Sequence, residues 1–144
     1  MSKLYVMVGL PGSGKSKYAK ERLSEAVYVG SDAIREELYG DEDCQNDPGR
    51  VFAEAYKRAD KALAEGRDVV LDSTALTKET RQFVMDGVHN ANFIEFVFID
   101  TPLRTCIERN EARKRVVPRR RMFVLAKLLE RPTYDEGNCV RVVN

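Results

Sequence analysis

Short apolar runs alternate along the chain with longer segments in which apolar residues recur at helical spacing. Each of the first four runs is continuous and ends in glycine or polar residues, as strands buried inside a parallel sheet do. These runs are LYVMVG (4–9), AVYVGS (26–31), RDVVLDST (67–74) and FIEFVFID (93–100). A last strand is predicted over CVRVV, residues 139–143.

The segments between these runs predict helices. In the longest segment, Phe52 begins a series of apolar residues at helical spacing, and Gly66 ends it. Asp47 and Pro48 supply an N-cap and a proline for the first helical position, and Thr77 can cap a helix through about residue 90. Other helices are expected over 15–24, 32–40, 102–113 and 122–129. This alternation predicts an α/β fold in which helices flank a parallel sheet.

Composition limits the class of protein. The 144 residues predict one domain over 1–144, and the net charge of +1 favours no particular partner. The cysteines Cys44, Cys106 and Cys139 are odd in number and far apart, so neither a disulfide partner nor a zinc site is expected. No apolar run is long enough to span a membrane. We therefore expect a cytoplasmic protein, in the host cytoplasm if a phage encodes it; the oligomeric state is not indicated.

The first strand runs directly into a glycine-rich loop. GLPGSGKS fits the pattern G-x-x-x-x-G-K-[ST] at every fixed position. In such a loop the glycines bring backbone N–H groups close to phosphate, the lysine reaches the β- and γ-phosphates, and the serine hydroxyl binds Mg²⁺. A glycine-rich turn with a surface lysine is the alternative, but this loop follows a buried strand and opens a helix. The expected ATP-binding residues are Gly9, Leu10, Pro11, Gly12, Ser13, Gly14, Lys15, Ser16 and Lys17.

The sequence after the third strand separates the classes of protein that share this loop. Asp72 is followed by Ser73, Thr74 and Ala75, so the Asp-x-x-Gly of a switch GTPase is missing, as is an Asn-Lys-x-Asp guanine signature. A motor ATPase usually has a second acidic residue beside the aspartate of its third strand, whereas Asp72 of this chain is followed by Ser73. A kinase fits the sequence best.

A kinase needs a group that accepts the proton of its acceptor hydroxyl. The single histidine, His89, lies near the end of a predicted helix, away from the ends of the strands. Asp32 is the first candidate base, because ligands bind at the carboxyl ends of parallel strands and this residue follows the second strand. Arg35 would share its helical face. The alternative is that Asp32 only caps the helix.

Two further aspartates end strands. Asp72 is in the usual place for a carboxylate that orients Mg²⁺ through Ser16 or a water molecule, and it could also hold Arg35. Thr74 follows it at the same edge. Asp100 is a weaker candidate, because Thr-Pro follows and a cap for the next helix is the expected role.

The segment RKRVVPRRR, residues 113–121, holds six cationic side chains and no acidic one. It suits a lid between two helices, whose mobile arginine would neutralise transition-state charge and contribute about 10³–10⁵ in rate. Arg113 is the first choice for that arginine, and Arg115 is the second. Alternatively the run is a solvated face, or Arg119–Arg121 follow a nucleic-acid backbone. An acidic segment, DEDCQND, covers residues 41–47.

The motifs GLPGSGKS, SDAIR, DVVLDST, RNEARKRVVP and ERPTYDEG occur in this order over nearly the whole chain. The set resembles the polynucleotide 5′-hydroxyl kinase branch of P-loop phosphotransferases, found in phage end-healing enzymes and animal kinase–phosphatases. The resemblance implies a P-loop fold with a five-stranded parallel sheet of order 2-3-1-4-5 and a lid over 113–121. It implies transfer of the γ-phosphate of ATP to a 5′-hydroxyl of DNA or RNA.

The resemblance also implies residue roles. Lys15 and Ser16 would hold the phosphates and Mg²⁺, and Asp32 would be the general base. Arg35 would grip a phosphate of the acceptor strand or orient the reacting groups. Asp72 would join Ser16 to Arg35, and the lid arginine would be Arg113.

This sequence also departs from the family. Ala75 stands where asparagine is common, and Asn138 stands where phenylalanine is common. No phosphatase motif occurs. Two other functions therefore stay open: a kinase for a nucleoside, sugar or antibiotic, and a non-catalytic nucleotide sensor.

Overall fold

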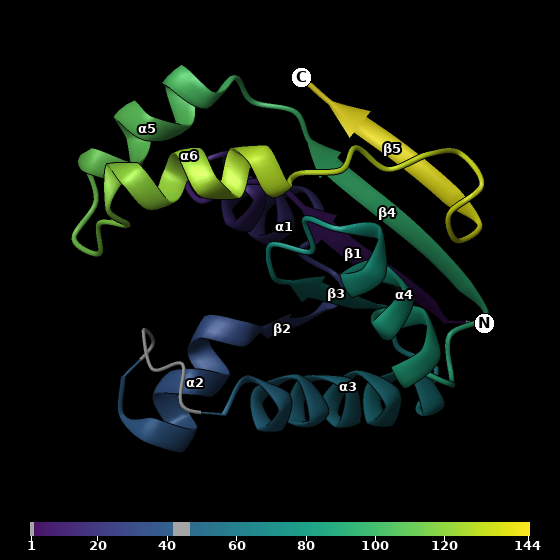
Figure 1. The fold of residues 1–144 in the computed structure, drawn as a ribbon. Coiled ribbons are helices and arrows are strands. Elements are labelled where there is room, and N and C mark those ends of the chain that lie inside the picture. Colours follow the sequence, from purple (N-terminus) through teal and green to yellow (C-terminus); the bar gives the residue numbers. More distant parts are fainter. Residues whose placement is uncertain (1, 42–46) are drawn as a thin grey trace.

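Five parallel strands form one sheet of order β2-β3-β1-β4-β5, which confirms the expected order (Figure 1). The computed structural model describes residues 2–41 and 47–144, so Cys44 and most of the acidic segment lie outside the described residues. The strands are β1 (Lys3–Val8), β2 (Val27–Gly30), β3 (Val69–Asp72), β4 (Phe93–Ile99) and β5 (Cys139–Val143). Because β1 pairs with both β3 and β4, the chain leaves the centre of the sheet and enters the glycine loop there.

The helices lie close to their predicted ranges. Asp47 caps α3 by accepting a hydrogen bond from the Arg50 N–H at 3.1 Å, and Thr77 caps α4 in the same way through the Thr80 N–H. The expected cap at Asp100 is wrong, because α5 begins at Leu103 without a side-chain cap. The helices are α1 (Lys15–Arg22), α2 (Ser31–Tyr39), α3 (Pro48–Ala64), α4 (Lys78–Gly87), α5 (Leu103–Glu111) and α6 (Arg119–Leu128).

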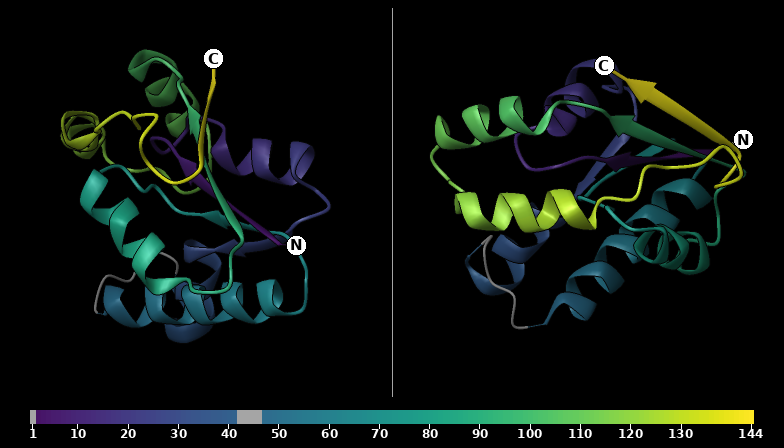
Figure 2. Two further views of the ribbon diagram at one scale, coloured as in Figure 1. Left: turned by 90° about the vertical axis from the view of Figure 1, so that its right-hand side faces the viewer. Right: turned by 45° about the horizontal axis from the view of Figure 1, so that its top comes forward.

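Helices cover both faces of the sheet, because alternate residues of its central strand point to opposite sides. Leu4, Val6 and Val8 are buried with residues of α3 and α4. Met7 is buried on the other face against Ala19 of α1. Figure 2 shows α1 on one side of the sheet and α3 and α4 on the other. Among the described residues, no helix is both long enough and apolar enough to cross a membrane.

A buried ion pair joins Arg81 of α4 to Glu136 in the loop before β5. The Arg81 guanidinium, which has no exposed surface, donates to the Glu136 carboxylate at 2.7 Å and to the carbonyl oxygens of Ala75 and Glu130 at 2.8 Å. Hydrogen bonds from Arg81 and from the Thr133 N–H outweigh the effect of burial and hold the pKa of Glu136 below its ordinary value. The ERPTYDEG motif therefore ties the end of α6 to the loop that follows β3.

Candidate active site

The glycine loop packs closely against the start of α5, and its backbone requires glycine. Gly12 and Gly14 have φ angles of +79° and +99°, a region that L-residues with a Cβ rarely adopt. A Cβ on Gly12 would lie 2.4 Å from the Cys106 carbonyl oxygen. The Ser13 carbonyl accepts hydrogen bonds from Thr101 Oγ1 at 2.7 Å and from the Arg109 guanidinium at 3.2 Å. These contacts fix the loop between β1 and α1.

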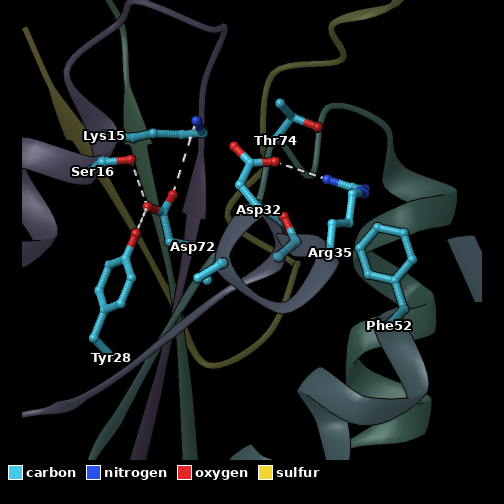
Figure 3. A pocket seen from close by; sticks show the side chains of 12 residues that line it. Lys15, Ser16, Tyr28, Asp32, Arg35, Phe52, Asp72 and Thr74 are labelled. Atoms are coloured by element: carbon cyan, nitrogen blue, oxygen red, sulfur yellow. Dashed lines mark hydrogen bonds and ion pairs between the residues drawn. The ribbon is translucent and has the colours of Figure 1, made fainter. Parts of the chain in front are cut away.

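Asp72 is the centre of a polar cluster beside this loop. Its Oδ2 accepts hydrogen bonds from Ser16 Oγ at 2.6 Å and from the Tyr28 hydroxyl (Figure 3). Its Oδ1 lies 3.9 Å from Lys15 Nζ. Burial, and then the hydrogen bond to Asp72, raise the pKa of Tyr28 well above its ordinary value, so the phenol keeps its proton. Among the described residues Asp72 forms no direct hydrogen bond or ion pair with Arg35, so the network expected to join Ser16 to Arg35 stays a prediction.

The same cluster fits a magnesium site. Asp72 Oδ1 is buried and has no hydrogen-bond partner among the described residues. Ser16 Oγ donates a hydrogen bond to Asp72, so the lone pairs of the serine oxygen remain available. Hydroxyl and carboxylate oxygens are ligands that Mg²⁺ takes, usually together with water and phosphate. The described residues contain no group of three or more His, Cys, Asp or Glu side chains that could hold a metal ion. The other ligands of Mg²⁺ at Ser16 and Asp72 would be water and the phosphates of a bound nucleotide.

Asp32 lies in the first turn of α2 between two arginines. The N-cap of α2 is Gly30, so Asp32 is not the capping residue. Its Oδ1 accepts a hydrogen bond from Arg35 at 2.8 Å, and its Oδ2 accepts one from Arg115 at 2.9 Å. The Arg35 side chain is buried, its Nε has no hydrogen-bond partner among the described residues, and its guanidinium carbon lies 5.9 Å from the centre of the Phe52 ring.

These groups line one pocket. The expected site residues Lys15, Ser16, Asp32, Arg35, Asp72 and Thr74 all contribute to it, together with Tyr28 and Phe52. In the view of Figure 3, Ser16 and Tyr28 lie on one side of Asp72, and Asp32, Arg35 and Phe52 lie on the other. His89 does not line this pocket; its N–H donates to Asp60. The pocket therefore places the half-exposed Asp32 carboxylate close to Lys15 and Ser16 of the glycine loop.

The segment between α5 and α6 supplies the arginines of the predicted lid. Arg113 donates to Asn110 Oδ1 at 3.1 Å, and it lines a second cavity with Lys15, Lys17 and Arg109 above the glycine loop. Asn110 also fastens the segment by binding both the N–H and the carbonyl of Val117. Arg113 thus faces the phosphate loop, whereas Arg115 reaches Asp32.

A third cavity extends from the other side of the glycine loop. It is lined by residues of the loop and of α1, by the loop after β4, and by the last residue of the chain, including Lys17, Tyr18, Asp100, Thr105 and Asn144. Asp100, which does not cap α5, pairs instead with Arg131 at 2.5 Å. A nucleotide whose phosphates lay in the glycine loop would have room for its nucleoside here.

Sequence reasoning missed three residues of this region. Tyr28 lies in an apolar run, and its spacing gives no sign that its hydroxyl reaches Asp72. Phe52 belongs to the series at helical spacing, which does not indicate that its ring lines the pocket. Arg109 is the first residue of the motif RNEARKRVVP, and this place in a motif was the one sign in the sequence that it belongs to the site.

Comparisons with known proteins identify the family of this chain. The family model described as an AAA domain matches residues 4–132. The chain belongs to this family. No curated protein matches this AAA domain at a significant level.

Solved structures similar to this AAA domain include several kinases. A chain of the Pnkp1/Rnl/Hen1 RNA repair complex superposes with a TM-score of 0.79 at 23% identity, covering 89% of this chain and 44% of that one. A gluconokinase from Sinorhizobium meliloti has a TM-score of 0.67 at 22% identity, covering 98% and 82%. The APS kinase CysC of Mycobacterium tuberculosis, in complex with AMPPNP and APS, has a TM-score of 0.60 at 22% identity, covering 98% and 88%.

These likenesses establish that the chain has the fold of P-loop kinases. The AAA domain spans less than half of the RNA repair chain that it matches. The structural relatives include both an RNA repair protein and kinases of small molecules, so they leave the acceptor open.

Proposed function

We propose that this protein is an ATP-dependent kinase that transfers the γ-phosphate to the 5′-hydroxyl end of a nucleic acid. The observation that carries the proposal is that Asp32 lines the same pocket as Lys15 and Ser16. A carboxylate is therefore available next to the place where the glycine loop would hold a triphosphate. That arrangement suits transfer to an alcohol, and it is more than a nucleotide sensor needs.

Each residue has its own role in this reaction. The acceptor hydroxyl loses its proton to Asp32 as its oxygen forms a bond to the γ-phosphorus, and the bond from that phosphorus to the β,γ-bridging oxygen breaks. Lys15 and the backbone N–H groups of the loop balance the charge that develops on the leaving ADP. Mg²⁺, held by Ser16 and through water by Asp72, would neutralise phosphate charge. Asp32 afterwards releases its proton to solvent.

Two observations favour a polynucleotide acceptor. Arg35 is anchored by Asp32 through one nitrogen, while its buried Nε has no hydrogen-bond partner among the described residues, which suits a grip on a phosphate of the acceptor strand. The Phe52 ring beside it offers a surface on which a base can stack. The structural relative from an RNA repair complex supports the same class of acceptor.

A kinase of a small molecule is the second candidate. The gluconokinase structure favours it, because this chain covers 82% of that protein but only 44% of the RNA repair chain. A small acceptor would use Asp32 as base in the same way and would have no need of the phosphate grip at Arg35.

One transfer assay separates these functions. The protein is incubated with ATP labelled at the γ-phosphate and, in parallel, with a 5′-hydroxyl oligonucleotide of DNA, one of RNA, a nucleoside and gluconate. We expect label on an oligonucleotide, and we expect its binding to weaken strongly with salt because of counterion release. Label only on a small molecule would identify the second candidate, and binding of ATP without any transfer would identify a sensor.

The base is tested with Asp32→Asn and Asp32→Ala. Both should retain ATP binding and lose transfer, because neither side chain accepts a proton. Glu36→Gln is the matched control, since Glu36 lies on the same helix with an exposed side chain. Transfer by Asp32→Asn at a rate close to that of the unmodified protein would remove Asp32 from this role.

A further inference from the structure

Tyr28 is the one aromatic residue of β2, and its hydroxyl ends at the carboxylate that faces the phosphate loop. The ring is partly exposed, yet the hydroxyl donates to Asp72 Oδ2, an atom of a buried side chain. The same oxygen accepts the proton of Ser16 Oγ. Two hydroxyl donors, one from β2 and one from α1, thus meet on a single carboxylate oxygen.

The backbone is shaped to permit this contact. Gly30 follows Tyr28 on the same face of β2, and a Cβ on Gly30 would lie 2.9 Å from Cε1 of the tyrosine ring. The ring therefore lies across a position that has no side chain. Lys20 Nζ of α1 lies over the ring, 5.0 Å from its centre. The tyrosine is held between the strand and α1 with its hydroxyl directed at Asp72.

Ser16 and Tyr28 both donate to Oδ2 of Asp72, so only one oxygen of this carboxylate accepts hydrogen bonds from the described part of the chain. Asp72 Oδ1 is buried without a hydrogen bond among the described residues, and Lys15 Nζ lies 3.9 Å away. Without the tyrosine hydroxyl, Asp72 would keep only the Ser16 donor and could rotate toward Lys15. A closer Asp72–Lys15 pair would draw the ammonium away from phosphate and would turn Oδ1 away from a hydrated cation.

We propose that Tyr28 is a positioning residue that fixes Asp72 and Ser16 for binding of the Mg²⁺–nucleotide complex. It does not touch the nucleotide. Its hydroxyl holds Asp72 Oδ2, so that Oδ1 faces the site and the Ser16 lone pairs are free. This inference rests on the nucleotide-binding half of the proposed function and is independent of the acceptor.

The test is calorimetric titration of AMPPNP into the full chain, in Mg²⁺ and separately in EDTA, with no acceptor present. Tyr28→Phe keeps the ring and removes only the hydroxyl. A hydrogen bond to a charged group contributes about 1.5–3 kcal/mol, which corresponds to roughly a tenfold or greater change in affinity. We expect Tyr28→Phe to weaken binding about tenfold in Mg²⁺ and to leave binding in EDTA unchanged. Tyr56→Phe, which removes a hydroxyl from α3 outside the pocket, should change neither.

A double-mutant cycle with Asp72→Asn tests whether Tyr28 acts through Asp72. We expect Tyr28→Phe to add no loss in Mg²⁺ once Asp72 has been replaced. Equal affinities of Tyr28→Phe and the unmodified protein in Mg²⁺, an equal loss in EDTA, or fully additive losses with Asp72→Asn would each overturn the proposal. If no acceptor is phosphorylated, the proposed function fails but these binding results are unaffected.

Discussion

Arg115 lies 2.9 Å from the Asp32 carboxylate, although 83 residues separate them in the chain. The contact brings the segment between α5 and α6 across to the first turn of α2. It occupies Oδ2, the oxygen of Asp32 that Arg35 leaves open. Both carboxylate oxygens of Asp32 therefore accept a guanidinium donor, so an acceptor hydroxyl can reach Oδ2 only if Arg115 leaves it.

The first prediction concerns this arginine. We expect Arg115 to move to the γ-phosphate when ATP binds, so Arg115→Ala should lower kcat by about 10³ or more, the range seen for arginines that neutralise a phosphoryl-transfer transition state. Single-turnover transfer to the identified acceptor measures the effect. Arg113→Ala is compared directly, because Arg113 already faces the glycine loop. Lys114→Ala is the control from the same segment. If Arg115→Ala transfers phosphate as fast as the Lys114→Ala protein, Arg115 has no catalytic part.

The second prediction concerns the glycine loop. Gly12 and Gly40 both have positive φ angles, +79° and +70°, but a Cβ on Gly40 would meet no atom within 4 Å. Gly40→Ala should therefore cost only the backbone strain of a left-handed L-residue, about 1–2 kcal/mol. Gly12→Ala adds a collision with the Cys106 carbonyl oxygen, so it should destabilise the fold more and abolish AMPPNP binding. Urea unfolding and calorimetry measure the two effects. Equal losses of stability and retained nucleotide binding in both variants would contradict this account.

The third prediction concerns the buried pair of Arg81 and Glu136. Removing one partner of a buried ion pair leaves an uncompensated charge, so Glu136→Gln should lower the free energy of unfolding by about 3–5 kcal/mol at pH 7. The native pKa of Glu136 lies below its ordinary value of 4.5. Its charge therefore stabilises the fold fully above that value, and the stabilisation is lost as the pH falls through the native pKa.

Urea unfolding at pH 7 and near pH 4 measures this dependence. We expect the difference between the unmodified protein and Glu136→Gln to shrink at the lower pH. Asp135→Asn is the matched control, because the Asp135 carboxylate is exposed and bonds to nearby groups at the surface, so its loss should cost much less stability than the loss of buried Glu136. A difference that stays constant with pH would show that the Glu136 charge is not what holds Arg81.

Much of the fold follows from local sequence. The strands, the glycine loop and the caps at Asp47 and Thr77 lie where periodicity and capping residues predict them. Lys15, Asp32 and Asp72 each follow or end a strand, and they line the same pocket, as expected for the carboxyl ends of parallel strands. Such features depend on a few neighbouring residues or on a rule for parallel sheets, so a single sequence carries them.

The long-range partners of the charged side chains follow from tertiary structure alone. Asp72 binds Tyr28 and not Arg35, Asp100 pairs with Arg131, and the segment between α5 and α6 reaches Asp32 through Arg115. Hydrophobic spacing fixes which face of an element is buried, but it does not fix which side chain of a distant element will meet a given carboxylate. That choice depends on strand order and helix placement, to within the length of a hydrogen bond, and it is made only when the whole chain packs.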